Sequence, residues 1–289
     1  MIDFDFHIHS APHSSCATQS VKEAVLKAYS AGIRTIALCD HNCIDGLEEA
    51  KIECNKLGMN FVNGVELSVT VSGVSESVDG NVIHILGYNI QPDKELFKEL
   101  KAQFDRDYQA QFDEKKKYLK SKGYCFSDLV ANNKELRKEL CANGYFSNDK
   151  DAKAFLHSDE IKKLFPPKKI PIDEVVNIIH SLGGIAVLAH PNSAENHVCL
   201  KIEQTNQIIK FLVAKGLDGL EVFHPVTVSE SGVVDNLLDQ AKVYNLKVTL
   251  GSDRHNCDDC DGNEYFPMAD KLKTIDYNFE AIRTFWEPR

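Results

Sequence analysis

The chain has no apolar run long enough to span a bilayer and no apolar segment near its N-terminus of the kind found in secretory leaders. We therefore expect a soluble, cytoplasmic protein without a membrane partner. The chain also lacks an excess of basic residues, since 33 Lys and Arg against 43 Asp and Glu give a formal net charge of -10. This balance argues against non-specific binding to duplex nucleic acid. A small anionic substrate stays open, because bound metal ions can reverse the local field.

A disulfide framework is not indicated either. The 9 cysteines are an odd number and lie scattered along the chain, which is typical of reduced thiols. Cys257 and Cys260 have the spacing of half a zinc ribbon, but no second pair has a matching spacing. Their role stays open between a structural zinc site and a polar surface loop.

Short apolar runs alternate with amphipathic segments in both halves of the chain, a pattern typical of α/β folds with a mostly parallel sheet. A hairpin is expected around the turn at Asp79 and Gly80. Ser20 is the predicted N-cap of the helix 21–32, and Gly58 ends the helix 46–58. The remaining helices are predicted over 172–184, 201–216 and 231–245. Strands are predicted over 1–8, 35–40, 60–71, 81–90, 185–191, 217–225 and 247–253.

The middle of the chain differs from the rest in composition and periodicity. Residues 93–168 are rich in Lys, Glu, Asp and Asn, show long helical periodicity and end at Pro166 and Pro167. We interpret them as a helical insertion between two parts of one barrel domain, 1–92 and 169–289. The insertion could act as a lid, with Lys162, Lys163, Lys168 and Lys169 near its exit meeting a phosphate. The alternative for each lysine is a solvated helical face.

Histidines fall where predicted strands end. Of the 11 histidines, His41, His190, His224 and His255 come at or shortly after a strand end, and His7 and His9 close the first strand beside Asp5. Active sites of such folds gather at the carboxyl ends of strands. We therefore expect these imidazoles to converge with the carboxylates Glu66 and Asp253.

Imidazole and carboxylate ligands without obligatory thiolate suit Mn²⁺, Zn²⁺ or Fe²⁺ better than Ca²⁺ or Mg²⁺. The number of candidate ligands exceeds what one tetrahedral ion needs. We therefore expect two or three divalent ions, with Glu66 able to bridge a pair. His84 could also be a core histidine. His224 could contact substrate or form a pair with Glu221 at the barrel rim.

Several motifs carry a resemblance to a known family. DFHIHS, CDHN, GVELS, HILGY, LAHP, GLEVFHP and GSDRH occur in this order and resemble the polymerase and histidinol phosphatase (PHP) superfamily. The long helical insertion after HILGY resembles its nucleotide-phosphatase branch of metal-dependent phosphoesterases. The resemblance implies a distorted (β/α)7 PHP barrel with a helical insertion and a site for two or three metal ions.

The resemblance also implies three sets of metal ligands. The first is His7, His9, Glu66 and Asp253, the second is Glu66, His84 and His190, and the third is His41, His255 and one residue from the loop after the first strand. Many relatives have Asp or His in that loop, where this chain reads SAPHSSCATQS. His13 or Cys16 could take the place, and we expect His13.

We predict hydrolysis of a small phosphomonoester, a nucleotide or nucleoside bisphosphate, by a metal-bound hydroxide. Glu66, His224 and Asp253 are the predicted catalytic residues, and His224 and Arg254 the predicted substrate contacts. Strand alternation would, however, turn Arg254 away from Asp253 and His255. The alternatives are a 5′-3′ exonuclease for short oligonucleotides, a histidinol-phosphate-type phosphatase, an amidohydrolase-like enzyme and a metal-binding module without activity. The sequence leaves the native metal and the oligomeric state open.

Overall fold

The computed structural model describes residues 2–14, 16–156, 158–165, 169–194, 198–256, 265 and 269–282. The predictions made for Lys168, Cys257 and Cys260 lie outside these residues, and so do the side chains of Lys162 and Lys163. Within the described part of the chain, no helix combines the length and the apolar character needed to cross a bilayer.

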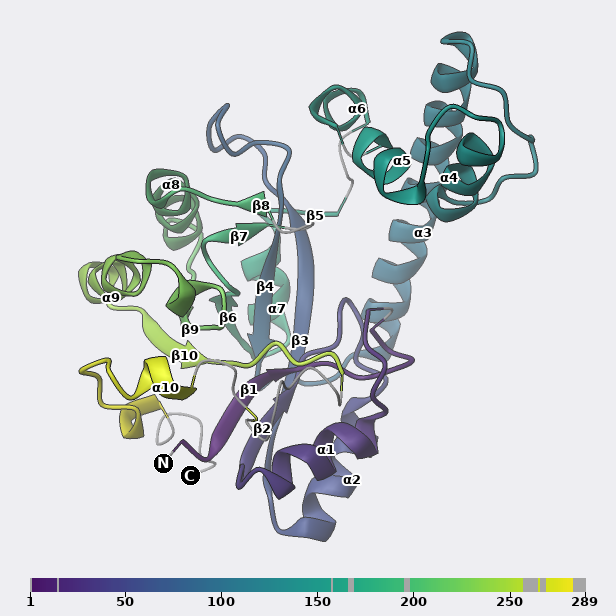
Figure 1. The fold of residues 1–289 in the computed structure, drawn as a ribbon. Coiled ribbons are helices and arrows are strands. Elements are labelled where there is room, and N and C mark those ends of the chain that lie inside the picture. Colours follow the sequence, from purple (N-terminus) through teal and green to yellow (C-terminus); the bar gives the residue numbers. More distant parts are fainter. Residues whose placement is uncertain are drawn as a thin grey trace. The chain divides into compact units, whose positions relative to one another are not determined.

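A barrel-like sheet forms the first part of the structure (Figure 1). The described residues give an 8-stranded sheet in which β5 (Ile170–Pro171) pairs with β3 beside the main path β1-β2-β3-β4-β6-β9-β10. Leaving β5 aside, this path matches the seven strands expected of the barrel, and the α/β barrel prediction is confirmed. The strands are β1 (Phe4–Ile8), β2 (Thr35–Leu38), β3 (Asn60–Thr70), β4 (Val82–Tyr88), β6 (Ile185–Leu188), β9 (Gly219–Phe223) and β10 (Lys247–Leu250).

Strand β4 is the antiparallel member of the barrel. It pairs antiparallel with β3 and with β6, whereas β1-β2, β2-β3, β6-β9 and β9-β10 are parallel. The expected hairpin at Asp79 and Gly80 therefore forms. Its turn is held by the Asp79 carboxylate, which accepts hydrogen bonds from the backbone N–H groups of Gly73, Val74 and Ser75.

The first and last strands meet at a seam. An isolated parallel bridge joins Ile8 to Arg254, and the backbone N–H of His9 donates to the carbonyl of Arg254 at 2.8 Å. The buried Asp5 carboxylate accepts from the N–H and the hydroxyl of Ser252 at 2.9 and 2.6 Å. These contacts bring the two ends of the barrel path together.

Helices cover the sheet where the sequence predicted them. Helix α1 (Val21–Ser30) begins with a capping box in which the Glu23 carboxylate accepts from Ser20 N–H, while the Ser20 hydroxyl accepts from Glu23 N–H. Helix α2 (Leu47–Leu57) ends at Gly58, whose φ of 66° requires glycine-like freedom. The later helices are α7 (Val175–Ser181), α8 (Ile202–Val213), α9 (Val233–Tyr244) and α10 (Ala269–Leu272), with a short 3-10 turn η2 (Thr227–Ser229).

The core between sheet and helices is apolar and close-packed. All five residues of β1 and of β9 are buried, as are all of β4. Two strands too short for a sequence pattern, β7 (Ser193–Ala194) and β8 (Val198–Cys199), form a separate antiparallel pair.

The chain divides into two compact units, residues 1–97 with 170–289, and residues 98–169. The second unit is helical, as its periodicity predicted, and has its own apolar core, which includes Phe112, Leu119, Leu136 and Leu140. Its elements are most of α3 (Lys94–Ser121), α4 (Asn133–Ala142), α5 (Asp149–Leu156) and α6 (Asp159–Leu164). The Lys169 ammonium lies 5.7 Å from the centre of the Phe104 ring, a cation–π contact within this unit.

Candidate metal centre

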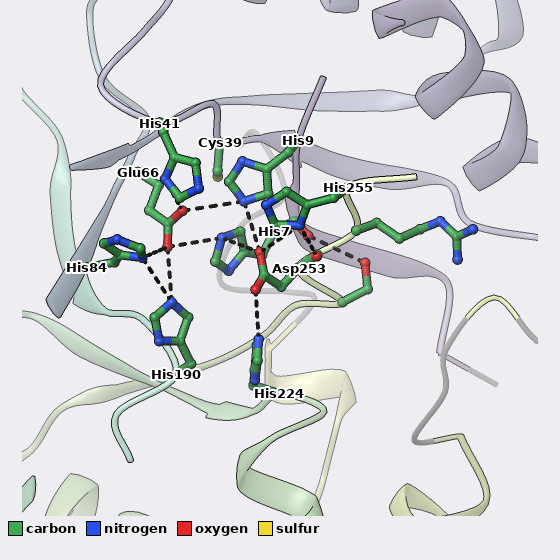
Figure 2. Close-up of polar contacts among 12 residues, drawn as sticks. His7, His9, Cys39, His41, Glu66, His84, His190, His224, Asp253 and His255 are labelled. Carbon is green, nitrogen blue, oxygen red and sulfur yellow. Dashed lines mark hydrogen bonds and ion pairs between the residues drawn. The ribbon is translucent and has the colours of Figure 1, made fainter. Parts of the chain in front are cut away.

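Imidazoles and carboxylates from six strands, or from the residues directly after them, converge in one cluster (Figure 2). Every predicted metal ligand except His13 belongs to this cluster. The members are His7 in β1, His9 after β1, His41 after β2, Glu66 in β3, His84 in β4, His190 after β6, and Asp253 and His255 after β10.

Glu66 lies at the middle of the cluster and is fully buried. Its Oε2 atom lies 2.8 Å from His41 Nδ1 and 3.4 Å from His9 Nε2. Its Oε1 atom lies 3.0 Å from His84 Nδ1 and 3.2 Å from His190 Nε2, and 3.4 Å from a fifth ring nitrogen, Nε2 of His7. One carboxylate thus faces five imidazoles, and both of its oxygens are shared among them.

Asp253 is the second carboxylate of the cluster. Its Oδ1 atom lies 3.0 Å from His9 Nε2 and 3.5 Å from His7 Nε2, and its Oδ2 atom lies 3.4 Å from His224 Nε2. The residue has a φ of 54°, a left-handed conformation that its N–H bond to the His7 carbonyl at 2.8 Å helps to hold. His190, with a φ of 29°, is also in this region. Such backbone strain is most common at functional sites.

Hydrogen bonds on the far side of the rings fix which nitrogen faces the centre. The Glu221 carboxylate lies 2.9 Å from His7 Nδ1, so this nitrogen keeps a proton and Nε2 faces Glu66 and Asp253. Burial lowers the pKa of His7, but Glu221, Glu66 and Asp253 outweigh it and hold this pKa well above its usual value, so Nε2 offers a lone pair once a metal ion displaces its proton. The Ser14 hydroxyl donates to Asp40 at 2.8 Å, so it accepts from His9 Nδ1 at 3.2 Å. His9 Nε2 therefore also presents a lone pair inward.

Backbone carbonyls accept from the outer ring nitrogens of two further histidines. His190 Nδ1 faces the Ser193 carbonyl at 3.4 Å, and His255 Nδ1 faces the Asp253 carbonyl at 2.7 Å. His224 has the opposite arrangement, because its Nδ1 accepts from the N–H of Val226 at 3.1 Å. Neutral His224 thus carries its proton on Nε2, the atom that points toward Asp253.

The pKa values reflect this crowding of buried charge. Burial would raise the pKa of Glu66, but His84, His41 and His7 hold it well below its usual value, so the carboxylate stays ionised. Burial and the neighbouring His41 lower the pKa of His9 to about 3, which leaves this ring neutral and able to donate a lone pair. A neutral imidazole and an ionised carboxylate are the forms that bind metal ions.

Three overlapping groups within the cluster could hold metal ions. In each group the ligand atoms lie within 4.8 Å of one another. Among the atoms of the described residues, His7 Nε2, His9 Nε2 and Glu66 Oε2 are buried yet make no hydrogen bond. Buried polar atoms without hydrogen bonds are costly unless a ligand satisfies them, so the donor set fits divalent ions. The groups are His7, His9, Glu66 and Asp253; His41, Glu66 and His84; and His9, His41 and His255.

The loop after β1 brings Cys16, and not His13, to the cluster. The exposed Cys16 thiol lies beside His255 and His41. Burial raises the pKa of the thiol, but hydrogen bonds to these two imidazoles outweigh it and bring the pKa to about 6. The expectation that His13 reaches this position is not met, because His13 groups with Cys43 and Asp45 instead.

One prediction and one alternative about neighbouring residues need correction. Arg254 is buried, and its guanidinium donates to the carbonyls of Tyr265 and Asn256 at 3.1 Å each, so the geometry does not support a substrate contact. Among the described residues, Glu221 makes no hydrogen bond with His224, so the alternative of a rim pair is not supported. Glu221 accepts from His7 Nδ1 and from the N–H of His190 instead, and so orients two residues of the cluster.

Sequence reasoning also missed a glycine. A Cβ atom at Gly251 would lie 2.2 Å from His7 Cβ and 2.4 Å from a Glu221 oxygen. Only glycine lets β10 approach β1 and β9 closely enough for the His7–Glu221 bond. The sequence signals were a carboxylate inside the apolar run GLEVF and a glycine directly before SDRH.

Comparisons with known proteins identify the family of this chain. The PHP domain family model matches residues 5–173. A 5′-3′ exoribonuclease of Haemophilus influenzae is 28% identical over 265 residues, which cover 87% of this chain and 89% of the relative. A 3′,5′-nucleoside bisphosphate phosphatase of Chromobacterium violaceum is 34% identical over 92 residues, 32% of this chain and 29% of the relative.

A solved structure supports the fold. The crystal structure of a candidate metal-dependent phosphoesterase from Bifidobacterium adolescentis superposes with a TM-score of 0.63 at 23% identity, over 94% of each chain. At this level of identity the likeness concerns the barrel and its connections.

Proposed function

This chain belongs to the PHP domain family and is a hydrolase of phosphoric ester bonds, and on that premise we propose that its substrate is a nucleotide. The observation that carries the proposal is the cluster around Glu66, in which the ring nitrogens of several imidazoles face two ionised carboxylates. A phosphate ester carries negative charge that such a cluster, once loaded with cations, would attract.

We assign the ions to the three groups described above. His7, His9, Glu66 and Asp253 would hold the first, Glu66 and His84 with the neighbouring His190 the second, and His41 and His255 the third. Divalent ions in these groups would acidify a water molecule and neutralise charge on the phosphoryl oxygens. The amidohydrolase-like alternative would call for a lysine as the bridging ligand, whereas the centre of this cluster is the carboxylate of Glu66, which supports phosphoester chemistry.

The protein's own part is to orient ligands and to move a proton. Glu221 and the Ser14–Asp40 pair fix the rings of His7 and His9, so that no rotation is needed at the moment of reaction. His224 carries its proton on Nε2 and points it toward the cluster. It would protonate the leaving oxygen or donate a hydrogen bond to the phosphoryl group.

Cys16 would complete the third group. Its thiol lies against His41 and His255, where the family resemblance implies an Asp or His from the same loop. A thiolate there would favour Zn²⁺ or Fe²⁺ over Mn²⁺ at this position, since sulfur is a soft ligand.

Two substrate classes are supported by different observations. The nucleoside bisphosphate phosphatase resembles this chain over only 92 residues, and it supports a small bisphosphate. The 5′-3′ exoribonuclease matches nearly the whole of both chains, and it supports a short RNA degraded from its 5′ end. The net charge of -10 disfavours long duplexes in either case.

The deciding experiment uses the Mn²⁺-loaded protein with two substrates in parallel, an adenosine 3′,5′-bisphosphate and a 5′-phosphorylated RNA of a few nucleotides. Release of inorganic phosphate from the first, or of mononucleotides from the 5′ end of the second, identifies the substrate class. His224→Gln serves as the matched variant, because it keeps the size of the side chain but removes the ring that carries the proton. If the loaded protein hydrolyses neither substrate while cleaving p-nitrophenyl phosphate, the nucleotide proposal is wrong.

A further inference from the structure

A second group of side chains that could hold a metal ion shares no residue with the centre. His13, Cys43 and Asp45 have ligand atoms within 4.8 Å of one another. His13 belongs to the loop between β1 and α1, whereas Cys43 and Asp45 belong to the loop between β2 and α2. We propose that these three side chains bind a Zn²⁺ ion that ties the two loops together.

The chemistry of the group points to zinc. One nitrogen, one sulfur and one oxygen ligand form a mixed set that Zn²⁺ accepts and that Ca²⁺ and Mg²⁺ do not. In tetrahedral zinc sites neighbouring ligand atoms are about 3.3–3.7 Å apart, so the observed spacing needs only small side-chain rotations to close. The thiolate and the carboxylate together neutralise the charge of the ion.

The exposure of these three residues supports a zinc site in which one coordination position is open to solvent. His13 and Cys43 are half-buried, and Asp45 is exposed. An ion there would be reached from solvent and would keep a water molecule as its fourth ligand, as zinc sites with three protein ligands do.

Packing at Gly46 shows that the two loops are already in contact. A Cβ atom at this position would lie 2.9 Å from His13 Cδ2 and 3.0 Å from an Asp40 oxygen. The His13 ring therefore lies directly on the backbone of the loop that carries Cys43 and Asp45. This contact positions the imidazole beside the thiol and the carboxylate without any movement of the backbone.

The proposed ion would act on the centre through Ser14, the residue after His13. The Ser14 hydroxyl donates to Asp40 and accepts from His9 Nδ1 and from the N–H of His41 at 3.0 Å. Fixing His13 would fix this hydroxyl and with it the orientation of His9 and His41. This consequence rests on the proposed function of the centre, whereas zinc binding at the second group does not.

The test counts zinc on the full-length protein. We expect Cys43→Ser to hold one zinc ion fewer per chain than the wild type, by elemental analysis after dialysis against buffered zinc. The matched control is Cys199→Ser, which removes another thiol at the surface and should leave the count unchanged. Asp45→Asn changes an exposed side chain and should weaken zinc binding by at least about tenfold.

Cobalt provides a second readout that separates this site from the centre. In a Cys16→Ser background, Co²⁺ bound at the second group gives a thiolate-to-cobalt absorption band that should be lost in the Cys16→Ser/Cys43→Ser double variant. In a Glu66→Gln background the Cys43-dependent zinc ion should still be counted, so a failure of the proposed centre leaves this result intact. An unchanged zinc count in Cys43→Ser, or unchanged affinity in Asp45→Asn, overturns the proposal.

Discussion

Replacing Glu66 with glutamine is the sharpest test of the centre. The change keeps the size of the side chain and removes one negative charge from a fully buried position that faces five ring nitrogens at 2.8–3.4 Å. Breaking a buried charge pair costs about 3–5 kcal/mol. At about 1.4 kcal/mol per factor of ten, we expect Mn²⁺ affinity to fall by about 10²–10⁴-fold. Phosphoester hydrolysis at limiting Mn²⁺ should fall in parallel.

Glu221→Gln is the matched control for this change. Glu221 is also fully buried and also contacts His7, but from the side away from the centre, at 2.9 Å from Nδ1. Loss of such an outer partner weakens metal binding by about 10–100-fold, less than the loss of a shared ligand. Isothermal titration with Mn²⁺ gives both affinities, and circular dichroism checks that each variant is folded. The reasoning fails if folded Glu66→Gln binds Mn²⁺ as tightly as the wild type, or more tightly than Glu221→Gln.

Three further predictions concern the thiol, the ions and the insertion. Alkylation of Cys16 by iodoacetamide in the metal-free protein should rise as pH increases through about 6, because the thiolate forms above its pKa. Mass spectrometry of the modified peptide checks this, and Mn²⁺ or Zn²⁺ should slow the reaction if Cys16 is a ligand. Removal of metal with a chelator should abolish hydrolysis and lower the melting temperature, and added Mn²⁺ should restore both. Leu136→Ala, in the core of the second unit, should destabilise that unit by about 2–5 kcal/mol in hydrogen exchange. Leu129→Ala, at a side chain that is 90% exposed, should change the stability of the unit little. An equal loss of stability in the two variants would refute the assigned core.

Much of the fold could be predicted because each barrel strand is a short apolar run bounded by polar or turn residues. The seven predicted strands and the helices between them all form, and the capping signals at Ser20 and Gly58 act as expected. The convergence of the histidines followed from one rule, that strand ends of such sheets meet at one edge. This rule was enough to bring Asp253 to His9, whereas Glu66 lies inside β3 and still faces His7 and His9.

The sequence predictions were wrong where a side chain's position depends on loop geometry or on contacts between distant strands. His13 and Cys16 lie three residues apart in one loop, and nothing in their spacing tells which of them turns toward His41 and His255. The partner of Glu221 depends on how closely β1 and β9 approach, and Gly251, directly after β10, leaves the space for this approach. The Arg254 side chain is turned away from the cluster, as strand alternation indicated. The alternation was therefore a better guide to its role than its position between Asp253 and His255 in the sequence.

The seam between β1 and the residues after β10 has a consequence for biosynthesis. A ribosome makes the two histidines of the first strand long before it makes Asp253, and the insertion lengthens that delay. Until the final strand emerges, the nascent polypeptide exposes an open sheet edge and an incomplete set of ligands. Metal capture should therefore be a late, post-translational event, and truncations from the carboxyl end should accumulate as aggregates and not as partly active fragments.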